Sequence, residues 1–166
     1  MATLQTLLVP IDGSPPSLAA LDHGVELAVD YDARVDVLHV VPLEDPLSPD
    51  ARIEVEREMN EAVARARMTL GARVMFRTVV GDPIREIVEA ARQGIDLIVL
   101  GTHGRIGRLH ELLGSVTEGV VRNAPCPVLT VRDPSAGYQS FAELRHHRPS
   151  LSDPESTRPG AEPPQR

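Results

Sequence analysis

A glycine-rich stretch in the second half of the chain has the residue types and spacing of a phosphate-binding turn. Gly101 and Gly104 are followed, after nine intervening residues, by the pair Gly114-Ser115. The stretch lies between an apolar, strand-like run and a helix predicted over residues 115–123. Such a turn exposes backbone N–H groups, and the partial positive charge at a helix start favours a phosphate. These residues therefore predict an anion site.

The composition limits how an anion could be held. All 17 basic residues are arginine, so the chain contains no lysine. Schiff-base chemistry and the phosphate-binding lysine of a Walker A loop are both excluded. A bound nucleotide would instead depend on glycine backbone, hydroxyl groups, the helix start, arginine or a metal ion. Arg105 and Arg108 could reach the phosphates or face solvent, and the same two alternatives hold for His103.

Length, composition and charge indicate one α/β domain and argue against a nucleic-acid partner. The 166 residues can bury one core, and 42% hydrophobic with only 2% aromatic residues is typical of an aliphatic, parallel-sheet interior. A net charge of −7 argues against nucleic acid as a partner. No apolar run approaches the ~18–20 residues of a membrane span. The N-terminus lacks a basic signal-peptide region, and the single Cys126 fits a reducing compartment, so we expect a cytoplasmic protein.

Predicted strands and helices alternate along the chain. Apolar runs predict strands over residues 6–11, 34–41, 73–80, 96–100 and 125–132. Helical periodicity predicts helices over residues 15–29, 50–70, 83–93 and 115–123, with Ile53 on the buried face of the second. This alternation favours a doubly wound α/β domain over residues 1–132. Six of the 15 prolines lie in residues 133–166, so we expect a Pro-rich, disordered tail there.

Two predicted strand ends carry unusual residues. Asp12 follows the first strand and Gly101 follows the fourth. Ligands of open α/β sheets bind beyond the carboxyl ends of the strands, where the strand order reverses. If the two strands are neighbours, both ends flank one crevice. Alternatively, Asp12 only accepts hydrogen bonds from the amides of the following turn.

Residues 1–132 resemble the universal stress protein family. The resemblance rests on VPIDGS and LHVV at the ends of the first two strands, on the G-x2-G-x9-G-S loop, and on the closing PCPVLTVR strand. The loop spacing is that of the ATP-binding branch of the family. The resemblance implies a five-stranded parallel sheet in the order 3-2-1-4-5, with helices on both faces. The first and fourth strands would then lie side by side.

The resemblance also implies roles for the residues around a base and a ribose. Pro10 and Ile11 would line an adenine slot, and Asp12 would accept hydrogen bonds from the ribose hydroxyls. Val40 would read the adenine edge through its backbone. The family commonly forms homodimers through the fifth strand, here Val128 to Val131.

The remaining implied contacts concern the phosphates. Gly101 and Gly104 would let the main chain approach the ribose and the phosphates. The β and γ phosphates would be held by Gly114, Ser115, Val116 and Thr117. A divalent cation, Mg²⁺ or Mn²⁺, would screen the triphosphate. Ser115 and Glu118 also form an S-x-x-E pattern, which predicts a capping box at the same helix start.

Three functions remain open at this point. The first is an ATP-binding regulatory protein whose nucleotide state alters its dimer or partner contacts. Its hydrolysis would be slow or absent, because no residue is recognisable as the one that positions an attacking water. The second is a nucleotide-free, dimeric interaction module. The third, an adenylyl transferase, is disfavoured because IDGS stands where such enzymes carry H-x-G-H. The scattered histidines predict no zinc site, and Cys126 is expected to be structural.

Overall fold

In the computed structural model, which describes residues 4–103 and 113–132, five parallel strands form one sheet in the order β3-β2-β1-β4-β5. The fold class and strand order that we expected are therefore confirmed. The predicted tail lies outside the described residues. The strands are β1 (Thr6–Pro10), β2 (Arg34–Val41), β3 (Val74–Val80), β4 (Leu97–Gly101) and β5 (Val128–Val131).

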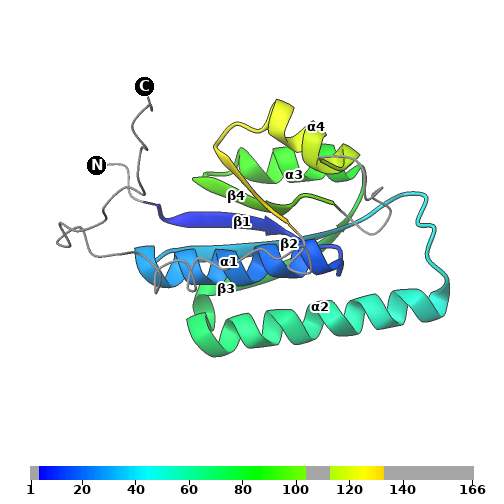
Figure 1. The fold of residues 1–166 in the computed structure, drawn as a ribbon, viewed down its shortest axis with the longest axis horizontal. Coiled ribbons are helices and arrows are strands. Elements are labelled where there is room, and N and C mark those ends of the chain that lie inside the picture. The colour runs from blue at the N-terminus through cyan, green and yellow to red at the C-terminus, as the bar shows by residue number, and fades with distance from the viewer. Residues whose placement is uncertain (1–3, 104–112, 133–166) are drawn as a thin grey trace, which may run out of the picture.

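Two helices cover each face of the sheet (Figure 1). One face carries α1 (Pro15–Tyr31) and α2 (Pro49–Leu70), and the other carries α3 (Pro83–Ala91) and α4 (Ser115–Asn123). A short 3₁₀ turn, Gly71–Arg73, joins α2 to β3. All five residues of β1 are buried, because helices cover this central strand on both sides.

The hydrophobic core has two parts, one on each face of the sheet. Successive side chains of a strand point to opposite faces, so Leu7 and Val9 pack toward α1 and α2, while Leu8 packs toward α3. The alternation continues in β2, where Val37 joins the first part and Leu38 the second. Both parts reach the carboxyl ends of the strands, where the candidate site lies.

Two details differ from the expectations. Ile53 is 65% exposed, because α2 packs on the sheet through the neighbouring stripe that begins at Val55 and Met59. The fifth strand begins at Val128 rather than at residue 125. Pro125 and Pro127 lack the N–H groups that a strand donates, which is consistent with the later start.

Candidate functional site: a cleft at the carboxyl edge of the sheet

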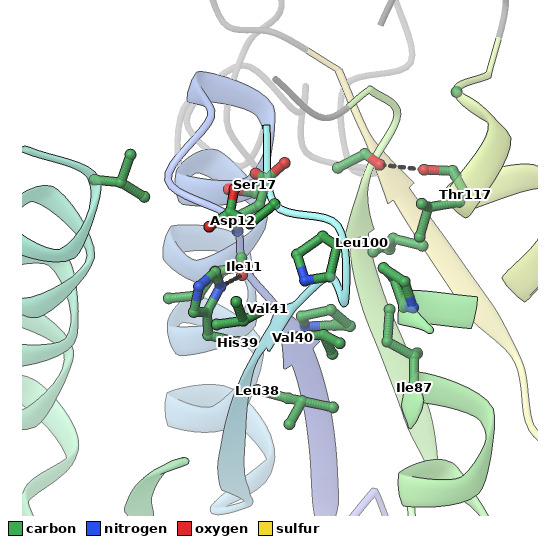
Figure 2. Close-up of a pocket in the computed structure, with 18 of the residues that line it drawn as sticks. Ile11, Asp12, Ser17, Leu38, His39, Val40, Val41, Ile87, Leu100 and Thr117 are labelled. Atoms are coloured by element: carbon green, nitrogen blue, oxygen red, sulfur yellow. Dashed lines mark hydrogen bonds between the residues drawn. The ribbon is translucent and has the colours of Figure 1, made fainter. Parts of the chain in front are cut away.

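A cleft of about 490 Å³ opens where β1, β2 and β4 end (Figure 2). β1 pairs directly with β4, so Asp12 and Gly101 lie on the same cleft, as the expected strand order required. The residues that line the cleft come from both faces of the sheet. Leu100 comes from the core beneath α3 and α4, whereas Ile11 and Val55 come from the opposite face.

The turn between β1 and α1 fixes the Asp12 carboxylate. Its Oδ1 accepts hydrogen bonds from the Ser14 backbone N–H at 3.0 Å and from the Ser14 hydroxyl at 2.5 Å. The Asp12 N–H donates to Ser17 Oγ at 3.2 Å. Gly13 has φ 76°, a left-handed conformation that favours glycine. Asp12 thus accepts a hydrogen bond from a turn amide and also lines the cleft, so the turn contact does not remove it from the candidate site.

His39 joins β2 to this turn. Its Nδ1 lies 2.9 Å from the Ile11 carbonyl oxygen, as the dashed line in Figure 2 shows. A carbonyl oxygen only accepts, so Nδ1 must carry the proton in this contact. The bond holds the residue just before Asp12 against the end of β2. His39 itself lines the cleft beside Val40.

The amino terminus of α4 forms the opposite wall. Gly114 is the N-cap residue of α4. Because glycine has no side chain, no side-chain hydrogen bond caps the first turn. The N–H groups of Ser115, Val116 and Thr117 have no acceptor within the helix, because they belong to its first turn. All three residues line the cleft. The Gly114 N–H is different, since it donates to the Thr102 carbonyl at 2.7 Å.

The predicted capping box does not form. Ser115 is the first helical residue rather than the N-cap, so its hydroxyl is not placed to cap the turn. Glu118 pairs instead with Arg122, at 2.7 Å between Oε1 and Nη2. The acidic side chain in the first turn is thus engaged by a cation one turn further along the same helix.

Thr117 ties α4 to the end of β4. Its hydroxyl donates to the Gly101 carbonyl at 2.7 Å, and the side chain is 3% exposed (Figure 2). Gly101 in turn packs against the start of α1. A Cβ at this position would lie 2.8 Å from both the Pro16 carbonyl carbon and the Ser17 nitrogen. A close approach of backbones therefore requires glycine here, whether or not a ligand is bound.

The sequence profile of the universal stress protein family matches residues 3–132, a range that includes every described residue. The chain belongs to this family. It is 37% identical over 139 residues to universal stress protein MJ0531 of Methanocaldococcus jannaschii, covering 77% of this chain and 82% of the relative.

Solved universal stress proteins share the fold. One, in complex with cAMP, superposes with a TM-score of 0.62 at 30% identity, covering 80% of this chain and 99% of the other. Another, from Archaeoglobus fulgidus in complex with dAMP, superposes with a TM-score of 0.59 at 25% identity, covering 78% and 99%. Nucleotides are thus bound by some proteins of similar structure.

The structure of this universal stress protein brings most of the predicted site residues together. Those that line the cleft are Pro10, Ile11, Asp12, Val40, Gly101, Gly114, Ser115, Val116 and Thr117. Gly104, Arg105 and Arg108 lie outside the described residues. His103, the last described residue before that gap, also lines the cleft.

Sequence reasoning missed the wall formed by the loop between β2 and α2. Asp45 accepts a hydrogen bond from the Leu47 N–H at 3.0 Å and pairs with Arg52 at 3.0 Å, and all three residues line the cleft. Prolines and acidic residues, as in this loop, are typical of an exposed connection and do not by themselves indicate a binding site. The available signal was Asp45 itself, because an Asp side chain often accepts a hydrogen bond from the backbone N–H two residues further along the chain.

The described residues hold no cluster of three or more His, Cys, Asp or Glu side chains that could bind a metal ion. Among these same residues, no helix is long and apolar enough to cross a membrane.

Proposed function

We propose that this universal stress protein binds ATP together with Mg²⁺ or Mn²⁺ in the cleft. The observation that carries the proposal is that the open amino terminus of α4 and the Asp12 carboxylate line one cleft. The helix start offers hydrogen-bond donors to phosphates, and the carboxylate offers an acceptor to ribose hydroxyls. A cleft of about 490 Å³ is within the usual range for small-molecule sites.

The ligand would span the three strand ends. Pro10 and Ile11 would hold the adenine, with the Val40 backbone at its edge, and Asp12 would contact the ribose. The phosphates would lie over α4, where they would also supply the ligands that the described cleft lacks for Mg²⁺ or Mn²⁺. The phosphate contacts would come from Gly101, Gly104, Gly114, Ser115, Val116 and Thr117.

Within this group, the structure supports different tasks for different residues. The first-turn N–H groups of Ser115 and Val116 are suited to contact phosphate directly. Thr117 donates its hydroxyl proton to Gly101 and so would act mainly by holding the helix start in place. Gly114 adopts an ordinary extended backbone, φ −70° and ψ 158°, so its missing side chain would serve ligand access rather than conformation.

We further propose that the nucleotide is sensed rather than rapidly hydrolysed, and that its presence tunes a homodimer or a partner contact. β5 is an edge strand, and residues Val128 to Thr130 are only half-buried. A free edge can pair with a second copy of the same strand. Light scattering with and without Mg-ATP would measure the dimer, and a monomer at high concentration would contradict this part of the proposal.

Isothermal titration calorimetry with Mg-ATP tests the binding proposal. We expect saturable binding by the wild type and its loss in Gly114→Val, whose side chain would occupy the approach to the phosphates. Gly94→Val is the matched control. Gly94 has φ 88° and does not line the cleft, so this variant should lose stability but keep binding. A wild-type protein that ignores Mg-ATP would favour the nucleotide-free interaction module instead.

A further inference from the structure

Ser14 occupies a helix N-cap position without capping the helix. A Ser N-cap normally accepts from the N–H of the second or third helical residue. Here the second is Pro16, which has no N–H, and no side-chain cap bond forms. The Ser14 hydroxyl donates instead to Asp12 Oδ1, 2.5 Å away. Ser14 is only 3% exposed, so this bond is shielded from solvent.

The hydroxyl has one proton and two acceptors within reach. Asp12 Oδ1 is at 2.5 Å and the His103 carbonyl oxygen is at 3.5 Å. The shorter contact, to a charged group, takes the proton. Ser14 therefore bonds the carboxylate of the β1–α1 turn while facing the backbone of the segment that follows β4. Ser14 does not itself line the cleft, but it contacts two residues that do, Asp12 and His103.

Two bonds on one oxygen fix the plane of the carboxylate. The Ser14 N–H and hydroxyl both donate to Oδ1, at 3.0 and 2.5 Å, and so restrain rotation of the Asp12 side chain. Ser14 is held in turn, because its carbonyl accepts from the Ser17 hydroxyl at 2.9 Å and from the Leu18 N–H at 3.0 Å. The orientation of the acceptor is thus set before any ligand arrives.

From this geometry we propose that Ser14 is the positioning residue that orients Asp12 toward the ribose hydroxyls of the bound nucleotide. The inference rests on the proposed ATP binding. It adds that the selectivity for a ribose over a 2′,3′-dideoxyribose depends on Ser14, which acts through Asp12. Preorganisation of this kind raises affinity by reducing the ordering cost of binding.

The experiment is a double-mutant cycle with two probes, Mg-ATP and its 2′,3′-dideoxy analogue, measured by calorimetry. We expect Ser14→Ala to weaken ATP binding about tenfold, as for the loss of one hydrogen bond to a charged group. Binding of the dideoxy analogue should not change. In an Asp12→Ala background, Ser14→Ala should have no further effect on ATP. Ser14→Gly also removes the hydroxyl and should behave like Ser14→Ala.

Ser48→Ala provides a matched control. Ser48 is also the N-cap serine of a helix, but it is exposed, caps α2 by accepting from the Ala51 N–H, and does not line the cleft. This variant should lose stability and keep the ratio of the two affinities. Equal weakening of both probes by Ser14→Ala, or additive effects in the cycle, would overturn the inference while ATP binding stood. Absence of ATP binding to the wild type would overturn the proposed function, and the inference with it.

Discussion

Replacing Thr117 by valine tests how the helix start of the candidate phosphate site is held. The Thr117 hydroxyl donates to the Gly101 carbonyl at 2.7 Å, and both residues are buried. Valine has nearly the same shape, so it removes the donor and leaves a buried acceptor without its hydroxyl partner. Such a loss costs about 1–3 kcal/mol. We expect Thr117→Val to lower the free energy of unfolding by about 2 kcal/mol.

Urea denaturation followed by circular dichroism measures this change. With a slope of about 2 kcal/mol per molar urea, a loss of about 2 kcal/mol moves the midpoint down by about 1 M. Thr117→Ser keeps the hydroxyl and loses only a methyl group, so its midpoint should lie much closer to that of the wild type. A wild-type midpoint for Thr117→Val would refute the reasoning. So would equal losses in the two variants, because the hydroxyl would then not be the cause.

Two further outcomes follow from the described contacts. Gly101→Ala should lower the free energy of unfolding by about 1–3 kcal/mol in the same assay, because its Cβ would meet Pro16 and Ser17 backbone at 2.8 Å. Gly119→Ala, whose Cβ would meet only the Ile84 side chain, should cost less, and the reverse order would contradict this reasoning. Burial raises the pKa of the Cys126 thiol, so at pH 8 more of it stays protonated than in free cysteine. Its alkylation by iodoacetamide should be slower than that of free cysteine and should accelerate with rising pH; an equal or faster rate at pH 8 would count against it.

Local sequence signals were sufficient for the elements and for much of the site. Proline and capping residues mark the starts of α2 and α3, where Ser48 and Asp82 accept from N–H groups in the first turn. The helix predicted over residues 115–123 has the same bounds in the structure. The error at Ile53 arose where a longer-range contact decides, because packing on the sheet selects which face of α2 is buried.

The candidate site was predictable in its residues but less so in its contacts. Glycine spacing and Asp12 indicated where the cleft would be. The sequence did not indicate that His39 bonds the Ile11 carbonyl, because the two residues are 28 apart in the chain. It also suggested a capping box at Ser115, whereas the chain places Gly114 at the cap. Which residue becomes the N-cap depends on the path of the preceding loop, a property of the tertiary structure.

By itself, the sequence determined the classes of chemistry available to this universal stress protein. The absence of lysine, the glycine-rich loop and the aliphatic strands depend only on residue type and local periodicity. Only the tertiary structure decided which groups share the cleft and which atoms are engaged. Pairing of β1 with β4 brings residues about 90 positions apart, such as Ser14 and His103, within 3.5 Å. Hydrogen-bond partners across such separations follow from strand order and packing, which no local pattern encodes.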